Sequence, residues 1–264
     1  MNIVVCLKQV PGTTEVKIDP KTNTLIRQGI KNIVNPFDTY ALEEGVRLRE
    51  KLSGKLSGKV TAISMGPPQA TEMLREAIAT GADDAVLLSD AAFAGADTLA
   101  TSFTLAQAVN KLGYDIVICG RQTIDGDTGQ VGPEMAEMLG ASFIAYVSHI
   151  EDINNERIRA KRMVGDGYEV VAAPLPAVIT VTKEINLPRL PSLRGVAKSK
   201  SAVIPVWTAE MLGVDKGRVG LSGSATKVIK VFFPQRVQCG EILKGGIPEQ
   251  VSRLVDKLRE AKVI

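Results

Sequence analysis

The side chains best suited to chemistry gather between residues 120 and 131, where aspartate, glutamine and threonine alternate with glycine. The glycines let backbone amides approach an anion closely, while aspartate and glutamine can hydrogen-bond ribose hydroxyls and the edge of a heterocycle. The spacing is neither GxGxxG nor a Walker loop, so the residues alone predict a nucleotide site of unspecified type. The candidate nucleotide-binding residues in this loop are Gly120, Arg121, Gln122, Thr123, Asp125, Asp127, Thr128, Gly129, Gln130 and Val131.

The flanking sequence predicts the elements that position this loop. Residues 115–119 form a short apolar run followed by a glycine, which is typical of a central parallel strand, and residues 134–139 indicate a short helix. Ligands of open parallel sheets bind outside the carboxyl ends of the strands, and a helix that opens at Thr128 or Gly129 would favour a phosphate. The alternative is an ordinary turn between strand and helix, although about ten residues exceed the usual length of such turns.

A second group of hydroxyls stands at the start of another predicted helix. Asp97 is a candidate N-cap, and Gly113 ends the helix. Thr98, Thr101 and Ser102 would place hydroxyls beside the free amides of the first turn, where a diphosphate would find two kinds of donor. A routine capped helix is the alternative interpretation.

Strands and helices alternate along the first part of the chain, which predicts βαβ units with right-handed crossovers. Asn35 and Pro36 begin a helix, with Asn35 as its cap. We therefore expect an α/β fold with an open, mostly parallel, doubly wound sheet, an antiparallel hairpin around Asn154 and Asn155, and an extended C-terminal arm. The expected strands are 2–8, 59–66, 84–90, 115–119, 142–150, 156–163 and 168–172, with 176–183 closing the sheet; 14–34 is a hairpin or excursion, and a helix spans 68–79.

The character of the chain changes beyond residue 184, where prolines, glycines and serines interrupt any long pattern. Between residues 183 and 200, five basic residues against one acidic residue give a net charge of +4, as in a solvated basic loop. Apolar segments at 203–207 and 229–233 are expected outside the core, where they would need a partner if exposed. An amphipathic helix is expected at 249–262. The expected domains are residues 1–185, 186–234 and 235–264.

Composition limits the class of protein. The 264 residues are 45% hydrophobic and 23% charged, and the net charge of +3 is too small to indicate nucleic acid. No apolar run reaches the length of about 18 residues that a membrane span needs, and the N-terminus shows no signal or transit pattern, so we expect a cytoplasmic protein without membrane insertion. Three distant cysteines without a CxxC pair, and a single histidine, His149, predict neither a disulfide framework nor a zinc site.

The loop at 120–131 resembles the nucleotide loop of the electron transfer flavoprotein beta subunit. Three further motifs support the resemblance, which covers nearly the whole chain in the family's order. One departure is Gly165, which stands where the family's second signature usually has an acidic residue. The motifs are residues 120–127 (GRQTIDGD) with Gln130, residues 35–38 (NPFD) with 41–44 (ALEE) and 47–48 (RL), residues 64–67 (SMGP), and residues 81–83 (GAD).

The resemblance implies that this chain binds FAD, with Cys6, Asn35 and Met65 as walls around the adenine. The sequence of residues 94–102 is typical of family members whose beta subunit holds FAD and takes part in electron bifurcation. Such a subunit pairs with an alpha subunit, receives electrons from NADH, and passes them to an acyl-CoA dehydrogenase or reductase and to a low-potential acceptor such as ferredoxin. In this family the C-terminal arm grips the partner, and Leu193 matches a leucine presented to acyl-CoA dehydrogenases.

Three alternatives stay open. Within the family, a non-bifurcating electron carrier holds AMP at the same site. An adenylating enzyme on a similar fold usually has a Ser-Gly-Gly-x-Asp-Ser loop after the first strand, whereas this chain has residues 8–11 (KQVP) there. A nucleotide-binding module without redox work would form a homo-oligomer. Residues 221–226 superficially resemble a phosphate loop but follow no clear strand. Neither the bifurcating nor the non-bifurcating flavoprotein requires a catalytic acid or base.

Overall fold

Nine strands form one sheet in the computed structural model, which describes residues 1–12, 17–18, 25–26, 32–52, 58–229 and 240–264. Seven neighbouring strands run parallel, and the two beyond them are joined antiparallel as a hairpin extension. This confirms the predicted open, mostly parallel α/β sheet. In spatial order the strands are β11 (Gly167–Pro174), β10 (Arg157–Val164), β9 (Ser142–Ile153), β12 (Ala177–Val181), β8 (Ile116–Gly120), β1 (Asn2–Cys6), β6 (Lys59–Met65), β7 (Asp84–Leu88) and β13 (Val206–Trp207).

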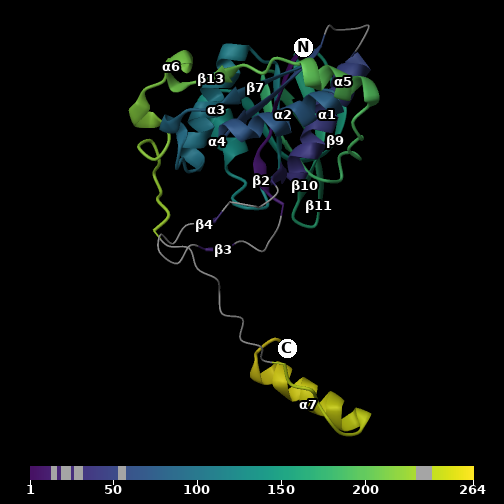
Figure 1. Ribbon diagram of the computed structural model, residues 1–264. Helices are drawn as coiled ribbons and strands as arrows, with labels where there is room; N and C mark the ends of the chain where they lie inside the picture. The colour runs from purple at the N-terminus through teal and green to yellow at the C-terminus, as the bar shows by residue number, and fades with distance from the viewer. Residues whose placement is uncertain (13–16, 19–24, 27–31, 53–57, 230–239) are drawn as a thin grey trace.

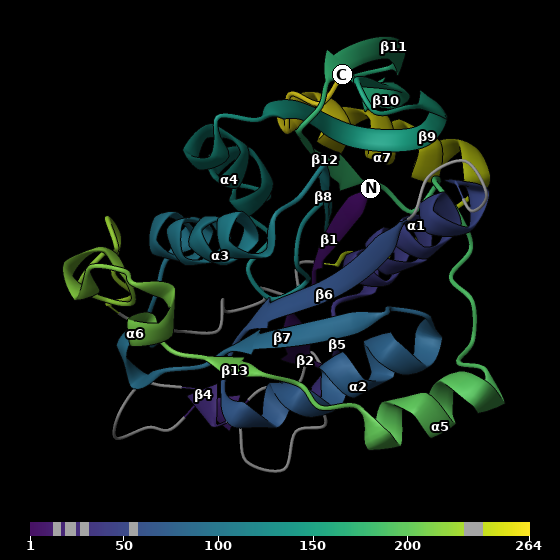
Figure 2. The same cartoon turned by 90° about the horizontal axis from the view of Figure 1, so that it is seen from above.

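Helices cover both faces of this sheet, as Figures 1 and 2 show. One face carries α1 (Pro36–Leu52), α2 (Thr71–Thr80) and α5 (Leu193–Ser201), and the other carries α3 (Thr98–Leu112) and α4 (Val131–Leu139). Short elements complete the described chain: the antiparallel pairs β2 (Gln9–Pro11) with β5 (Asn32–Val34) and β3 (Lys17–Ile18) with β4 (Leu25–Ile26), the 3-10 turns η1 (Pro68–Ala70), η2 (Ala91–Phe93) and η3 (Lys216–Arg218), and the helices α6 (Ala209–Leu212) and α7 (Ile247–Glu260).

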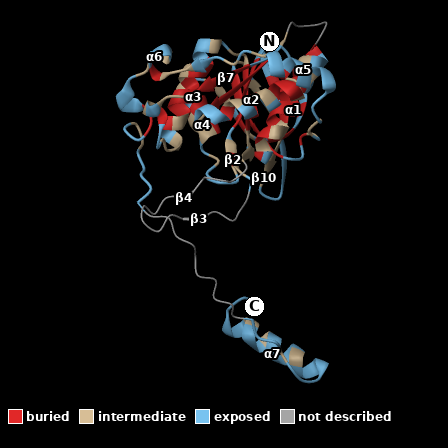
Figure 3. Ribbon diagram, in the orientation of Figure 1, coloured by how far each residue is buried: buried red, intermediate tan, exposed pale blue. Residues whose placement is uncertain are grey.

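The central strands are buried on both faces because helices pack against each side (Figure 3). Alternate residues of β1 belong to different cores: Ile3 and Val5 face the α1 and α2 side, and Val4 faces the α3 and α4 side. Such two-sided burial explains why the sequence of these strands is almost continuously apolar. The result is a rigid sheet whose carboxyl edge can hold loops in fixed positions.

The chain reverses its direction across the sheet at β1. From β1 it builds outwards through β6 and β7, then returns through α3 to place β8 on the other side of β1. The loops that follow β1 and β8 therefore leave the carboxyl edge side by side and diverge to opposite faces. A crevice at such a switch point is the usual ligand site of open α/β sheets.

Most predicted elements are confirmed, but three details differ. The strand expected to close the sheet, β12, lies inside it between β8 and β9. Val206 and Trp207, expected outside the core, pair with β7 as an edge strand. The helix expected to open at Thr128 or Gly129 begins at Val131. The excursion at 14–34 and the apolar segment at 229–233 lie largely outside the described residues.

The last helix, α7, stands apart from the sheet in Figure 1. None of its residues is buried, and Ile247, Val251 and Leu254 are about half exposed or more. This amphipathic helix was predicted at 249–262. In the described part of the chain, no helix is both long and apolar enough to cross a bilayer.

Helix α5 packs against α2 so closely that glycine is required at its first turn. A Cβ atom at Gly195 would overlap the carbonyl oxygen of Ala79. The same interface is fixed by Arg75, whose Nη1 donates to the carbonyl of Ser199 at 2.7 Å and to that of Ala202 at 3.1 Å.

We therefore expect Gly195→Ala to lower the free energy of unfolding by about 1–3 kcal/mol, because α5 must shift away from α2. Urea denaturation of the purified protein measures this change. Gly167→Ala is the control, since a Cβ atom there meets nothing within 4 Å. Equal stability of the two variants would contradict the tight α2–α5 contact.

Candidate functional site

The loop between β8 and α4 lies open at the carboxyl edge of the sheet. Its backbone leaves β8 through Arg121, whose amide donates to the carbonyl of Val181 at 3.0 Å. Asp127 and Gly129 have φ angles of 54° and 64°, in the left-handed region. Within the described residues, the amides of Thr128, Gly129 and Gln130 donate to no protein acceptor. A left-handed turn with unengaged amides is a cradle for an anion.

Asn35 holds this loop from below. The residue is fully buried. Its Nδ2 donates to the carbonyl oxygen of Gln122 at 2.9 Å, and its Oδ1 accepts from the amide of Ile124 at 3.2 Å. The side chain thus hydrogen-bonds a carbonyl and an amide of one turn of the loop, instead of capping α1 as the sequence predicts. These two hydrogen bonds tie Asn35 to the backbone of the loop.

Asp38 completes this anchor and was not recognised from the sequence as a site residue. Its Oδ1 accepts from Nδ2 of Asn35 at 2.9 Å, and its Oδ2 accepts from the amide of Lys8 at 2.7 Å. Burial raises the pKa of Asp38 to about 7, although the hydrogen bonds from Asn35 and Lys8 oppose the rise. One carboxylate therefore joins the end of β1, the start of α1 and the base of the loop.

The carboxylate of Asp38 also explains the glycine that ends β8. A Cβ atom at Gly120 would collide with Oδ1 of Asp38 and lie 2.7 Å from the carbonyl carbon of Phe37. The sequence predicts that glycine at 120 lets the backbone approach a ligand. The structure shows a second reason for glycine here, the close contact with α1.

An ion pair bridges the two diverging loops above the crevice. Nζ of Lys8 lies 2.8 and 2.9 Å from the carboxylate oxygens of Asp125. Partial burial would raise the pKa of Asp125, but the hydrogen bond and charge of Lys8, with help from Thr123, lower it overall. Nε2 of Gln122 donates to Oδ1 of Asp127, so both side chains face each other across the loop.

The predicted hydroxyls at the start of α3 face the first turn of α4. Asp97 caps α3 as expected, accepting from the amide of Ala100 at 3.1 Å. Thr98 Oγ1 lies 3.1 Å from Oε1 of Gln130 and 3.1 Å from Oε1 of Glu134, while Oγ of the buried Ser102 donates to Oε2 of Glu134 at 2.8 Å. Glu134 is a site residue that the sequence reasoning missed, and its spacing within α4 gave no signal of this role.

The remaining predicted residues line the carboxyl edge at different depths. Cys6 is paired in register with Cys119 across β1 and β8, and both are buried. The hydrogen bond between them and their burial raise the pKa of the Cys6 thiol. Met65 is partly exposed at the end of β6, and Thr101 is partly exposed in the first turn of α3.

Tyr146 is a third residue that the sequence did not reveal. It lies in β9 with a φ of 57°, at an irregularity in the pairing with β12. The guanidinium of Arg121 lies 4.9 Å from the centre of its ring. A bulky residue in the left-handed region is strained, and such strain is common at functional sites. Periodicity predicted β9 but could not predict its bulge.

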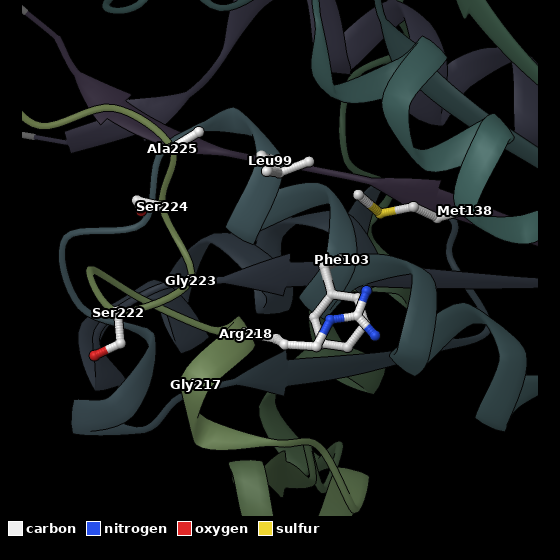
Figure 4. A pocket seen from close by; sticks show the side chains of 9 residues that line it. All are labelled: Leu99, Phe103, Met138, Gly217, Arg218, Ser222, Gly223, Ser224 and Ala225. Carbon is white, nitrogen blue, oxygen red and sulfur yellow. The ribbon is translucent and has the colours of Figure 1, made fainter.

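A cavity of about 250 Å³ lies on the other flank of α3. Figure 4 shows the guanidinium of Arg218 over the ring of Phe103, at 3.9 Å from its centre. The segment at 221–226 forms one wall, and its end is tied to α3 because Oδ2 of Asp97 accepts from the amide and the hydroxyl of Thr226. This segment follows a 3-10 turn and not a strand, which agrees with its rejection as a phosphate loop. The cavity is lined by Leu99, Phe103, Met138, Gly217, Arg218, Ser222, Gly223, Ser224 and Ala225.

The site has no features of a metal centre, and the predicted partner residue lies elsewhere. Among the described residues, no cluster of three histidine, cysteine, aspartate or glutamate side chains could hold a metal ion. His149 is exposed on β9, as predicted. Leu193 opens α5, on the α2 side of the sheet, and is 93% exposed.

The raised pKa of Asp38 predicts how stability depends on pH. The folded state binds this proton more tightly than the unfolded state, so the stabilisation is complete below the ordinary pKa of 3.8 and is lost as pH rises through about 7. As the pH rises from about 5.5 to 7.5, deprotonation of Asp38 should lower the free energy of unfolding by about 2 kcal/mol.

Chemical denaturation across this pH range, with Asp38→Asn as the comparison, measures the effect. The variant should lack this part of the pH dependence. If both proteins show the same slope, the carboxyl titrates at its ordinary pKa and our assignment is wrong.

Comparisons with known proteins agree with the resemblance seen in the sequence. The profile of the electron transfer flavoprotein domain matches residues 22–212. An electron transfer flavoprotein subunit beta of Thermoanaerobacterium thermosaccharolyticum is 50% identical, and one of Clostridium acetobutylicum is 48% identical, each over the full length of both chains. A caffeyl-CoA reductase-Etf complex subunit, CarD, of Acetobacterium woodii is 45% identical, also over the full length of both. The chain therefore belongs to the electron transfer flavoprotein family, among its beta subunits.

Proposed function

We propose that this chain binds FAD at the 120–131 loop and works in a heterodimer with an alpha subunit. The heterodimer takes electrons from NADH and divides them between an acyl-CoA dehydrogenase or reductase and a low-potential acceptor such as ferredoxin. The observation that supports this proposal most directly is the exposed loop at the switch point of the sheet, fixed by Asn35 and presenting unengaged amides.

The residues present fit the adenosine and diphosphate part of FAD. Amides at 128–130 and the cation of Arg121 suit phosphate oxygens. Carboxylates of Asp125 and Asp127 suit ribose hydroxyls, and the edge formed by Cys6, Met65 and Asn35 suits an adenine ring. At the start of α3, Thr98, Thr101 and Ser102 supply further hydroxyl groups, and Asp97 supplies a carboxylate.

The flavin would supply the redox chemistry, and the protein would bind and orient it. The Asn35–Asp38 anchor holds the loop backbone, so the amides are already aimed before the ligand arrives. The ion pair of Lys8 and Asp125 bridges the loops that follow β1 and β8. None of these residues needs to transfer a proton.

The partners are supported by the relatives and by exposed surface. The name of the Acetobacterium woodii relative places that protein in a reductase–Etf complex, which supports an acyl-CoA reductase or dehydrogenase as partner here. The apolar stripe of α7, with Ile247 at 78% exposure, is suited to burial against an alpha subunit. We place the protein in the cytoplasm, where free thiols such as those of Cys6 and Cys119 persist.

A carrier without bifurcation, holding AMP at this site, is the second candidate. The observation that favours it is the engagement of Thr98 and Ser102 with Glu134. These contacts leave fewer donors for a second phosphate and place a carboxylate near it.

The small molecules released when the purified heterodimer is denatured distinguish the two candidates. Two equivalents of FAD per heterodimer support the bifurcating type, and one FAD with one AMP supports the simple carrier. Absorbance and mass spectrometry identify both. A heterodimer that releases no adenine nucleotide from this chain would overturn the proposal.

Asn35→Ala should weaken nucleotide binding, because the loop loses both of its buried side-chain contacts. We expect the dissociation constant to rise at least about tenfold, the effect of losing about one buried hydrogen bond. The measurement is titration of nucleotide into the nucleotide-free heterodimer. Asn154→Ala is the matched control, since Oδ1 of Asn154 likewise accepts from two backbone amides, but in a distant hairpin turn. An equal loss in both variants would contradict the role given to Asn35.

A further inference from the structure

Three leucines project from the segment that leads into α5. Leu187 and Leu190 are each 88% exposed, and Leu193 is 93% exposed. Exposed leucines at every third position are unusual for a free surface and favour a contact with another protein. A flexible segment would have to be ordered upon binding, at a cost in affinity.

Arg189, which lies between Leu187 and Leu190, is fixed to α1 by the nitrogens of its guanidinium group. Nε of Arg189 lies 2.8 Å from Oε2 of Glu43, and its Nη2 lies 3.1 Å from Oε1 of the same residue. Nη1 and Nη2 also bond Glu50, at 2.7 and 2.9 Å. The backbone amide of Arg189 adds a contact to Glu43 at 3.2 Å. We call these three residues the Arg189 clamp.

The burial of Glu43 makes this clamp strong. The Glu43 side chain is 6% exposed, while that of Glu50 is 49% exposed. Within the described residues, Arg189 is the cation that pairs with Glu43. Removing a buried carboxylate's partner is costly, so the arginine has a strong reason to stay in place. A bidentate fork also fixes direction, which a lysine ammonium cannot do.

Contacts just before the clamp anchor the same segment to the same helix. Nδ2 of Asn186 donates to the carbonyl of Tyr40 and to Oε2 of Glu44, each at 3.0 Å. Nη1 of Arg47 donates to the carbonyl of Ile185 at 3.3 Å. The backbone of residues 185–189 is therefore held along α1, while the leucines on either side of Arg189 point to solvent.

We propose that Arg189 is a positioning residue for partner recognition, which holds Leu187, Leu190 and Leu193 in a fixed arrangement for an acyl-CoA dehydrogenase. This inference rests on the proposed function for the kind of partner, but the ordering of the segment is independent of it. Arg189 acts through the leucines, because its own side-chain contacts are with Glu43 and Glu50.

The test compares heterodimers with Arg189→Gln, Arg189→Lys and Arg194→Gln. Arg194→Gln is the matched control, because it removes the same charge from the same arm while its side chain makes no hydrogen bond or ion pair in the described residues. The readouts are amide hydrogen exchange in residues 186–193, bound flavin, and reduction of a purified acyl-CoA dehydrogenase of the same organism. The double variant Glu43→Gln/Arg189→Gln removes the clamp without leaving a buried charge, in case the single variant folds poorly.

Loss of the clamp should speed exchange of the backbone amide of residue 189, which donates to Glu43, about tenfold and raise the KM for the dehydrogenase about tenfold, with kcat and flavin content unchanged. The exchange rate and KM of Arg189→Lys should lie between those of Arg189→Gln and the wild type. The exchange rate of Arg194→Gln should match that of the wild type. Unchanged exchange would overturn the inference, even if the KM rises, because Arg189 would then contact the partner directly. If the wild type reduces no dehydrogenase, the proposed function fails, and the exchange data still decide whether Arg189 orders the segment.

Discussion

The buried hydrogen bonds between Asn35, Asp38 and the loop after β8 are the constraint on which the site depends. A glycine-rich loop with left-handed residues has many conformations, and fixing one of them costs conformational entropy. Asn35 offsets this cost by bonding both a carbonyl and an amide of the loop. Asp38 orients Asn35 in turn. The amides that face solvent are thus arranged by a buried pair of side chains that hold the backbone of the loop.

Helix α1 links this arrangement to the segment before α5. Its first turn provides Asp38 under the loop, and its later turns provide Glu43, Glu44 and Glu50 for the segment before α5. Buried carboxylates on a helix surface are expensive unless paired. Here the pairings fix two segments, the loop after β8 and the segment before α5, so one helix sets the spacing between the proposed nucleotide site and the exposed leucines.

The order of elements, the doubly wound sheet and the position of the loop could be predicted, because they follow from local patterns such as the apolar run at 115–119 and the Asn35-Pro36 start of α1. What could not be predicted depends on pairing between distant residues. The interior place of β12, the edge strand Val206–Trp207, and the engagement of Ser102 by Glu134 all arise from tertiary contacts. The bulge at Tyr146 likewise has no local signal, since an aromatic residue in a strand suggests regular pairing.

The place of β13 has a consequence for how the chain folds. Val206 and Trp207 pair with β7, and β12 inserts beside β8, in both cases long after the partner strand has left the ribosome. Contacts so distant along the chain slow folding, because a large loop must close before they form. During synthesis the flank of β7 stays an open strand edge, a template for pairing with other chains. Nascent copies of this protein should therefore depend on chaperones until residue 207 has emerged.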